Sequence, residues 1–462
     1  MDKQEEKDIE RENGDPVLYQ GRQVGFEILN RILLGGGYSN LIIKNALSDK
    51  KFSEDDKQAA VNLVYGVLRN LSLIDNVLRS KAEKGKLTVS PKVLNLGRMA
   101  VFEILFMYKI PKYATVSEYM VMIKENCGAS EGGFMNACLR KVVRKDKDVL
   151  LKSVKDAVEN LALRYSHPNW YVKKIADFYG IKEASHILRA NNNPQPVYFR
   201  LNTKRVDKEE FISINRYQRK EYQEVDLLPN CFMLPYGKGG FPHHEYESGW
   251  LTPQDVSTQF IPFFLSPEPG DHILDLCCGS GVKTTQLLEI MGDEGEVTAV
   301  DIFEHKIQSL KSECERLGLK SYRVIQADIS KAPDLGAFSK VLLDAPCSGS
   351  GTVRRRPEIK TRLLEKDIGK ASGVQDILLH RASKYVKKYG ILVYATCSIF
   401  REENAERVER FLHEHPDFEP MTDQVARSNN VEIGKSDGFG VTFLPVAVNG
   451  CGTYVSVLRR NQ

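Results

Sequence analysis

The 462-residue sequence contains no apolar run close to the roughly 20 residues that a membrane-spanning helix needs, so no membrane span is expected. Residues 1–7 are highly charged and lack the apolar core of a secretory signal. The nine cysteines include no CxxC pair, which argues against a zinc ribbon or a thioredoxin-type site. These absences predict a cytoplasmic protein with reduced thiols and no metal.

The composition is that of an ordinary globular protein, with 42% hydrophobic and 27% charged residues. A chain of this length can hold two or three domains, each with its own core. Residues 1–15 contain seven acidic and three basic residues, so residues 1–20 are predicted to form a disordered tail. Because the tail carries −4 of a total charge of +4, the remainder carries +8. That surplus is compatible with a nucleic-acid partner but does not require one.

Two regions precede the repeating part of the sequence. Apolar residues recur at helical spacing throughout residues 21–148, which predicts an all-helical first domain. A strand-like alternation over 197–202 and a predicted helix over 209–222 indicate a small α+β module spanning 155–249.

From residue 250 to 462 the sequence alternates between strand and helix patterns. A predicted strand over 273–277 leads into a helix over 283–290, and a later helix over 376–389 precedes a strand over 391–394. Repeated units of this length predict a parallel, doubly wound α/β sheet.

A glycine-containing turn joins the first of these strands to its helix. Glycine lets backbone N–H groups approach a bound ligand closely. The turn lacks a complete GxGxxG and a P-loop, so nicotinamide dinucleotides and nucleoside triphosphates are less expected than S-adenosylmethionine, which has no phosphates. The candidate cofactor-binding residues of this turn are Cys277, Cys278, Gly279, Ser280, Gly281, Val282 and Lys283.

Acidic residues also follow the next strands. Asp301 comes 26 residues after Asp275, at a place that suits a ribose diol. Asp328 ends the following strand and could accept a hydrogen bond from an adenine amino group. Each aspartate alone could be a helix cap or part of a solvated turn. Together, Asp275, Asp301 and Asp328 at three successive strand ends favour a pocket for an adenosine cofactor.

Two cysteines occupy comparable places farther along the chain. Cys347 follows the apolar run 341–343 in the motif Asp-Ala-Pro-Cys-Ser, which begins at Asp344, and Cys397 follows the run 391–394 in the motif Ala-Thr-Cys-Ser. Because parallel strands present their carboxyl ends to one crevice, two thiols and a carboxylate are predicted to meet there. Such a set suggests covalent catalysis.

These motifs resemble those of the RNA cytosine-5 methyltransferases, in particular the RsmB type, also called Fmu or Sun, which modifies small-subunit ribosomal RNA. The helical region resembles the NusB-like RNA-binding domain of that type. The resemblance implies a multidomain protein, with an all-α NusB-like domain over 21–148, a small α+β linker or RNA-binding module over 155–249 and a Rossmann-like class I methyltransferase domain over 250–462. The matching segments are residues 133–140, 250–255, 274–277, 283–284, 300–301, 343–351, 354–360, 394–398 and 402–404.

The resemblance also implies roles for individual residues. Cys397 is expected to add to carbon 6 of a cytosine, and Cys347 to assist release of the product. Asp344 is expected to contact the cofactor and to hydrogen-bond the N3/N4 edge of the base, while Lys283 holds it and lowers the pKa of a nearby thiol. The run Arg354, Arg355 and Arg356 is expected to contact RNA phosphates, although it could be a solvated basic turn. The expected partner is small-subunit ribosomal RNA, bound by a monomer.

Several other functions remain open at this point. The substrate could be transfer RNA or another RNA, or the protein could be an inert NusB-like RNA-binding or assembly factor. The intact set Cys397, Cys347, Asp344 and Lys283 argues against an inert protein. A DNA cytosine-5 methyltransferase would use the Pro-Cys thiol and carry a large target-recognition segment after it, which this sequence lacks. A small-molecule methyltransferase would need neither the second thiol nor the helical region.

Overall fold

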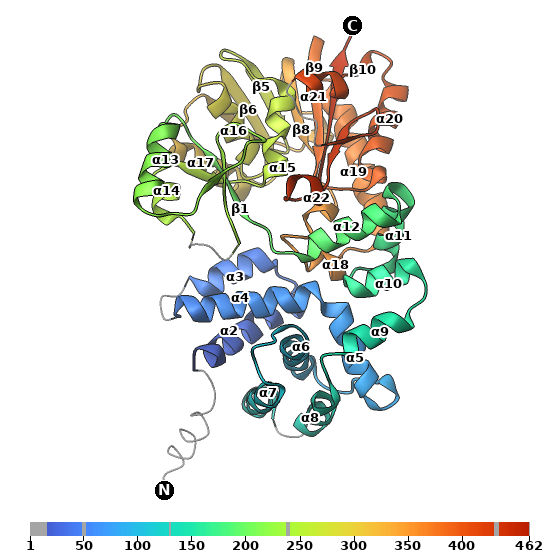
Figure 1. Ribbon diagram of the computed structural model, residues 1–462. Helices are drawn as coiled ribbons and strands as arrows, with labels where there is room; N and C mark the ends of the chain where they lie inside the picture. The colour runs from blue at the N-terminus through green and yellow to red at the C-terminus, as the bar shows by residue number, and fades with distance from the viewer. Residues whose placement is uncertain (1–15, 49–51, 129–130, 237–240, 429–433, 462) are drawn as a thin grey trace. The chain divides into compact units, whose positions relative to one another are not determined.

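The computed structural model describes residues 16–48, 52–128, 131–236, 241–428 and 434–461 (Figure 1). The chain divides into two compact units: unit 1 comprises Met1–Asn192 and Arg355–Arg362, and unit 2 comprises Asn193–Arg354 and Leu363–Gln462. Of the tail predicted over residues 1–20, residues 1–15 lie outside the described part of the chain. From Pro16 onward the chain is helical, so its last five residues were wrongly assigned to the tail.

The described part of unit 1 is built from helices, as predicted (Figure 1). Its first domain begins with α2 (Pro16–Leu33), α3 (Ser39–Leu47), α4 (Glu54–Arg69), α5 (Leu71–Lys81) and the 3-10 turn η1 (Glu83–Gly85), and continues with α6 (Pro91–Phe106), α7 (Lys112–Cys127), α8 (Gly132–Lys141) and α9 (Asp146–Ser153). The helices α10 (Ala157–Arg164), α11 (Asn169–Tyr179), α12 (Ile181–Asn192) and α18 (Ile359–Arg362) complete it.

Local sequence signals start these helices, and an apolar core holds them together. Ser53 caps α4 in a capping box, where its hydroxyl accepts from Asp56 N at 3.1 Å and Asp56 accepts from Ser53 N at 3.2 Å. Inside the core Arg22 donates to both carboxylate oxygens of fully buried Glu103, each at 2.8 Å. Such a pair must stay intact, because removing one partner leaves a buried charge without compensation.

The segment Arg355–Arg362 comes from the middle of the sequence predicted to form the methyltransferase domain, yet it belongs to unit 1. Its Lys360 is buried, and the ammonium donates to the carbonyl oxygens of Arg69 and Tyr165 at 2.8 and 2.9 Å and to Asn192 Oδ1. The helices α10–α12 of the predicted 155–249 module also belong to unit 1. The compact units therefore do not follow the boundaries expected from the order of the chain.

Unit 2 begins with a small antiparallel sheet in the order β2-β3-β1-β4. The helix predicted over 209–222 ends at Tyr217, because the chain turns at Arg219, whose φ is 54°. The elements of this part are β1 (Val197–Leu201), α13 (Lys208–Tyr217), β2 (Gln223–Glu224), β3 (Cys231–Leu234), α14 (His243–Glu247) and β4 (Leu251–Pro253).

A larger mixed sheet forms the rest of unit 2, in the order β11-β12-β13-β9-β8-β5-β6-β7, with β10 beside β13. Its parallel strands are β5 (His272–Leu276), β6 (Glu296–Asp301), β7 (Tyr322–Gln326), β8 (Phe338–Asp344) and β9 (Val386–Thr396). The predicted parallel sheet is thus confirmed, and it is extended by the antiparallel strands β10 (Phe418–Pro420), β11 (Lys435–Ser436), β12 (Val441–Phe443) and β13 (Thr453–Arg460).

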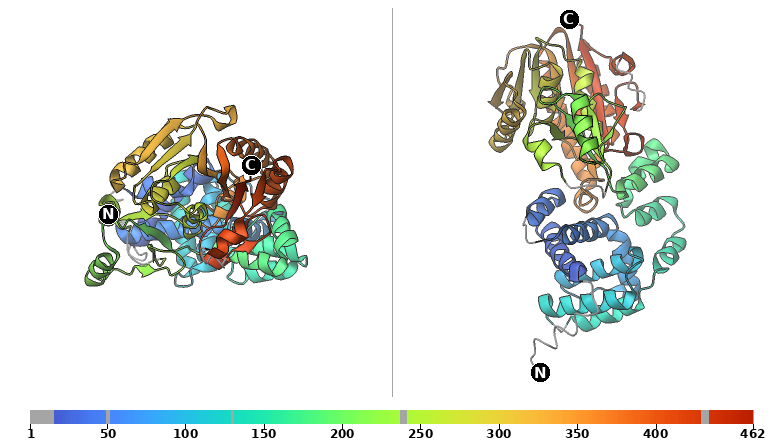
Figure 2. Two further views of the ribbon diagram at one scale, coloured as in Figure 1. Left: turned by 90° about the horizontal axis from the view of Figure 1, so that it is seen from above. Right: turned by 60° about the vertical axis from the view of Figure 1, so that its left-hand side comes forward.

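Helices cover both faces of the parallel strands (Figure 1; Figure 2). Alternate strand residues face opposite layers, so that Ile273 packs with the cluster containing Leu287 and Leu310, whereas Leu274 packs with the cluster containing Leu378. The helices are α15 (Val256–Gln259), α16 (Val282–Ile290), α17 (Glu304–Leu317), α19 (Glu365–Ser383), α20 (Ala405–Glu414), α21 (Thr422–Ser428) and α22 (Pro445–Val448), and the 3-10 turns are η2 (Ile261–Leu265), η3 (Ile329–Lys331), η4 (Ser350–Thr352) and η5 (Arg401–Glu403).

A second helix also differs from its prediction. The helix expected over 376–389 ends at Ser383, and β9 begins at Val386. Pairing with β8 moves from Phe338↔Val386 to Lys340↔Ile391, so the residues between are bulged, and Tyr389 takes a φ of 62°. Strand pairing therefore overrides the helical spacing of these residues. Along the described ranges, no helix has the length and apolar character needed to span a membrane.

Candidate active site

The site lies where the order of the parallel strands reverses direction. From β5 the sheet grows through β6 and β7 on one side and through β8 and β9 on the other. Ligands of open α/β sheets bind outside the carboxyl ends of strands at such a reversal. The residues that end or follow β5, β6, β8 and β9 are the ones that the sequence singled out.

The turn between β5 and α16 has an unusual backbone. Cys277, Gly279 and Gly281 have φ values of 60°, 60° and 82°, and the cysteine is a rare residue in this left-handed region. A Cβ on Gly281 would lie 2.5 Å from Leu310 Cγ, so glycine is required there for close packing on α17. A Cβ on Gly279 would meet nothing within 4 Å, which leaves open space beside the turn.

The thiols of the turn are not suited to be nucleophiles. Burial, then the carboxylates of Asp301 and Asp344, raise the pKa of Cys277 to about 12. Burial also raises the pKa of Cys278, whose N–H donates to Val300 O at 3.0 Å. Both thiols therefore stay protonated, and the two residues shape the turn through their backbone and side-chain volume rather than supply a thiolate.

Asp301 holds the turn against the end of β6. Its Oδ2 accepts from Gly279 N at 2.9 Å, and its Oδ1 accepts from Phe303 N at 3.0 Å. The residue is only 4% exposed. Because each carboxylate oxygen can accept a second hydrogen bond, Asp301 keeps acceptor capacity for the hydroxyl groups of a ribose.

Asp275, the next-to-last residue of β5, is one of the three aspartates that the sequence analysis placed at strand ends, but it was given no role of its own there. Its Oδ2 accepts from Thr284 Oγ1 at 2.6 Å, whereas its buried Oδ1 has no hydrogen-bond partner among the residues that the structure describes. Burial raises the pKa of this carboxyl to about 7. An unsatisfied buried oxygen in the strand that leads into the turn fits a site that a polar ligand completes. Its place one residue before the end of the strand was the signal in the sequence.

Asp328 has a local structural role. Its Oδ1 accepts from Ser330 N at 3.0 Å and from Ser330 Oγ at 2.6 Å, which caps η3. The hydroxyl of Ser330 lowers the pKa of Asp328. The cap occupies one oxygen and leaves Oδ2, which lies 3.9 Å from Lys331 Nζ, for any ligand at the end of β7.

Lys283 and Asp344 form the ion pair expected from the sequence. Lys283 Nζ donates to Asp344 Oδ2 at 2.6 Å, joining the first turn of α16 to the last residue of β8. Burial, the largest single effect, lowers the pKa of Lys283, but the charge and hydrogen bond of Asp344 together with the charges of Asp275 and Cys397 raise it, and the net pKa lies above the ordinary value. The lysine therefore remains protonated and holds the carboxylate in place.

The two motif cysteines meet at the same edge. Their Sγ atoms lie 2.7 Å apart, and Cys397 N lies 3.2 Å from Cys347 Sγ. The hydrogen bond from the Cys347 thiol lowers the pKa of Cys397, although burial opposes it. The same hydrogen bond, together with burial, raises the pKa of Cys347 well above its ordinary value. Of the two, Cys397 is the better thiolate.

Glu403 links the two cysteine loops and had no assigned role in the sequence analysis. This fully buried carboxylate accepts from Ser348 N at 2.7 Å, from the hydroxyls of Ser348 and Ser398, each at 2.5 Å, and from Gln375 Nε2 at 3.1 Å. The next residue, Asn404, donates to Ser398 O at 2.9 Å. Each serine directly follows one of the cysteines, so Glu403 sets their relative position.

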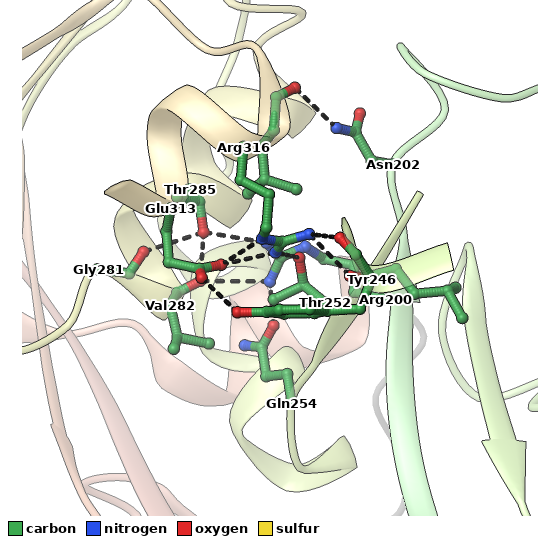
Figure 3. Close-up of polar contacts among 12 residues, drawn as sticks. Arg200, Asn202, Tyr246, Thr252, Gln254, Gly281, Val282, Thr285, Glu313 and Arg316 are labelled. Carbon is green, nitrogen blue, oxygen red and sulfur yellow. Dashed lines mark hydrogen bonds and ion pairs between the residues drawn. The ribbon is translucent and has the colours of Figure 1, made fainter. Parts of the chain in front are cut away.

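Arg200 on the small sheet makes polar contacts with helix α16 (Figure 3). Buried Arg200 on β1 donates to Glu289 Oε2 at 2.6 Å, to Thr285 Oγ1 at 3.0 Å and to Val282 O at 3.2 Å, all on α16, and to Gln254 Oε1 after β4. All these partners lie within one helix and one adjacent loop, so the small sheet positions the helix that carries Lys283.

The three predicted phosphate-binding arginines are not together. Arg354 is 5% exposed and donates to Asn193 O, Pro194 O and Asn449 Oδ1 at 2.7 to 3.1 Å. The expectation that it contacts RNA phosphates is therefore wrong, because its donors are engaged inside unit 2. Arg355 and Arg356 are exposed and belong to unit 1, where Arg356 lies 5.4 Å from the ring centroid of Tyr38.

Within the described ranges, no group of three or more histidine, cysteine, aspartate or glutamate side chains is arranged to hold a metal ion.

Comparisons with known proteins cover nearly the whole chain. A family described as 16S rRNA methyltransferase RsmB/F matches residues 262–459, the NusB family matches 20–144, and the ferredoxin-like domain of RsmF/B-like methyltransferases matches 167–236. The ribosomal RNA small subunit methyltransferase B of Escherichia coli (strain 536) is 32% identical over 406 residues, which are 84% of this chain and 90% of that protein.

Solved structures share the fold. The crystal structure of PH0851 has a TM-score of 0.76 at 24% identity, covering 97% of this chain and 99% of its own. NSun6 from Pyrococcus horikoshii, solved with SFG, has a TM-score of 0.57 at 19% identity, covering 64% of this chain and 98% of its own. With the sequence relatives and the family matches, this likeness leads to one conclusion: the chain belongs to the RsmB/F family of 16S rRNA methyltransferases.

Proposed function

We propose that the protein methylates carbon 5 of a cytosine in small-subunit ribosomal RNA, using S-adenosylmethionine and a covalent bond between Cys397 and carbon 6 of the base. The observation that carries the proposal is the meeting of two thiols, 2.7 Å apart, with the Lys283–Asp344 ion pair at the carboxyl edge of one parallel sheet.

The turn beside Gly279 and the carboxylate of Asp301 support an adenosine cofactor. Asp301 has acceptor capacity for ribose hydroxyls, and Asp275 offers a buried oxygen without a partner. We assign the rest of the pocket to Asp328, Asp344, Lys283 and the turn residues Cys277, Cys278, Ser280, Gly281 and Val282. When bound, S-adenosylmethionine supplies an electrophilic methyl group.

The chemistry requires activation of the base, because carbon 5 of cytosine is a weak nucleophile. The Cys397 thiolate adds to carbon 6, and the electron pair of the 5,6 double bond moves to carbon 5, where it is delocalised toward N3. In this proposal Asp344 hydrogen-bonds the N3/N4 edge and favours the charge that the ring takes up, and its ion pair with Lys283 supports this role. Carbon 5 would then bond to the methyl group while the bond between that methyl group and the sulfonium sulfur of the cofactor would break, leaving a neutral thioether.

Release reverses the first step. A base removes the proton from carbon 5, the double bond re-forms, and the carbon–sulfur bond breaks with Cys397 leaving as a thiolate. We assign Cys347 to assist this release, and the distance of 2.7 Å between its Sγ and that of Cys397 supports the assignment. A cytosine in a duplex must first be unstacked to reach this site.

The ribosomal substrate is proposed from the relatives, which are named as small-subunit methyltransferases. Transfer RNA or another RNA is the alternative substrate, and an inert RNA-binding or assembly protein is the other alternative. The intact thiols and ion pair favour an enzyme. We further propose that it works as a monomer in the cytoplasm, without a metal.

A methyl-transfer assay tests the proposal. The protein is incubated with methyl-tritiated S-adenosylmethionine and unmodified small-subunit ribosomal RNA, and the RNA is digested to nucleosides for chromatography. We expect label in 5-methylcytidine and none with Cys397→Ala. Label only in transfer RNA would establish the alternative substrate, and RNA binding without any label would establish an inert protein.

A further inference from the structure

Unit 1 presents exposed tyrosines among cations at one place on its surface. Tyr108, between α6 and α7, is 61% exposed, and Tyr113, in the first turn of α7, is 79% exposed. Arg144 and Lys147 contact Tyr108, and further exposed cations precede or follow these residues in the chain. We call the set the tyrosine–cation surface, and it consists of Tyr108, Lys109, Lys112, Tyr113, Arg140, Lys141, Arg144, Lys145 and Lys147.

Contacts within unit 1 hold these side chains together. Arg144 donates to Tyr108 O at 3.0 Å, and its guanidinium carbon lies 5.1 Å from the centroid of the Tyr108 ring. Lys147 Nζ donates to the Tyr108 hydroxyl at 3.2 Å. Lys112 Nζ donates to Arg140 O at 2.6 Å, which joins the start of α7 to the end of α8. The surface is therefore a set arranged by tertiary contacts and not only a run of charges in sequence.

The positive charge of the surface is not neutralised by its one interspersed acid. Residues 139–147 contain five basic side chains and a single acidic one, Asp146. Asp146 already accepts from Lys81 Nζ and from Val143 N, each at 2.7 Å. Lys141 and Lys145 are exposed beside it and remain directed to solvent.

The positive charge continues along the chain into an open hollow of about 570 Å³ at α9 and α10. Lys152, Lys155 and Arg164 line it, together with the single acid Asp148. Helix α9 joins the two places, because it carries both Lys147 and Lys152. A basic surface of this length suits a polyanion rather than a single small anion.

We propose that the tyrosine–cation surface binds a single-stranded segment of the RNA substrate. Unpaired bases stack on the rings of Tyr108 and Tyr113 and on the Arg144 guanidinium, while Lys141, Lys145 and Arg140 contact phosphates. Duplex RNA buries its base faces and could use only the cations. The exposed aromatic rings therefore favour a single strand. This inference rests on the proposed function for the identity of the polyanion.

Binding of a short fluorescein-labelled single-stranded RNA to the full chain, followed by anisotropy between about 50 and 200 mM salt, tests the proposal. Tyr113→Ala should weaken binding roughly 5- to 100-fold, because one base can no longer stack, and should leave the salt dependence unchanged. Lys141→Gln combined with Lys145→Gln should instead flatten the plot of log affinity against log salt by about 0.7 for each phosphate that the protein no longer neutralises.

Two exposed residues provide matched controls. Tyr389 is a 66% exposed tyrosine on β9, and Lys124 is an exposed lysine on α7, so Tyr389→Ala and Lys124→Gln should bind as the unmodified protein does. Tyr113→Ala binding with unchanged affinity would overturn the proposal. Equal loss of affinity for a blunt RNA duplex would also overturn it, because stacking would not be the cause.

Methyl transfer separates this inference from the proposed function. Tyr113→Ala should raise the KM for RNA and leave kcat at saturating RNA unchanged, since the residue is not in the catalytic site. If the protein methylates RNA but these variants bind RNA normally, the proposed RNA-binding surface is refuted and the proposed function is supported. If the variants lose RNA binding as described but no methyl transfer occurs with any RNA, the proposed RNA-binding surface is supported and the proposed function is refuted.

Discussion

The Sγ atoms of Cys347 and Cys397 lie 2.7 Å apart, although 50 residues separate them in the chain. They follow β8 and β9, neighbouring parallel strands in which Asp344 pairs with Ala395. At this distance a proton on one sulfur stabilises a thiolate on the other, so the two residues act as one unit with different roles.

The first prediction separates the two thiols. Cys397→Ala should abolish both methyl transfer and the covalent adduct, because carbon 6 is no longer attacked. Cys347→Ala should still attack and methylate but release slowly, and should therefore accumulate a protein–RNA adduct. A denaturing gel shows the adduct as a slowly migrating band.

Cys127→Ala, at a cysteine of unit 1, is the control and should behave as the unmodified protein does. The DNA-type assignment makes the opposite forecast for the two motif cysteines. An adduct that persists in Cys397→Ala and vanishes in Cys347→Ala would reverse the roles of the two thiols.

A second prediction concerns the cofactor. Asp301→Ala should weaken S-adenosylmethionine binding by about 1–3 kcal/mol, the usual cost of losing a charged hydrogen-bond partner. Asp328→Ala should cost less, because one of its oxygens caps η3. Isothermal titration calorimetry measures both, with circular dichroism as a check on folding. Unchanged affinity in Asp301→Ala would remove this residue from the site.

A third prediction concerns Glu403, which joins the loops of both cysteines. Glu403→Gln replaces an acceptor oxygen with an amide donor that faces the hydroxyls of Ser348 and Ser398. The cysteines should shift, and kcat should fall roughly 10- to 100-fold while cofactor affinity is unchanged. Steady-state kinetics measure this, with the neighbouring Glu402→Gln as control. A lower melting temperature with normal kcat would make the role of Glu403 structural only.

A fourth prediction follows from the buried Asp275, whose pKa of about 7 lies above the value of about 3.9 for an unfolded chain. Between these values the folded state keeps a proton that the unfolded state releases. Its stabilising effect is therefore complete below about pH 4 and is lost as the pH rises through about 7.

Asp275→Asn removes this titration and keeps the shape of the side chain. Relative to the unmodified protein it should gain stability as the pH rises, by on the order of a few kcal/mol at pH 8. Thermal unfolding at about pH 4.5 and pH 8 measures the difference, and exposed Asp226→Asn is the control. A stability difference that does not vary with pH would show that Asp275 is ionised in the folded protein.

Local patterns predicted much of the fold and the centre of the site. Some helices of unit 1 begin at capping residues, as α4 does at Ser53, and the alternating elements after residue 250 form the predicted parallel sheet. Cys347, Cys397 and Asp344 could be placed together from the sequence alone, because parallel strands end at a common edge. In each case the necessary information lies within a few neighbouring residues.

Other features depend on partners that are distant in the chain. Arg354 is buried because Asn193 and Asn449 enclose it, and Lys360 belongs to unit 1 because Arg69 and Tyr165 receive its ammonium. No local pattern distinguishes these cations from solvated ones.

The sequence by itself determined the elements and the identity of the reactive groups, since helix and strand periodicity, capping and motif chemistry are local properties. Only the tertiary structure decided which polar side chains are enclosed. A buried charge or amide must find partners to offset its lost hydration, and those of Arg200 and Glu403 come from other elements of the fold.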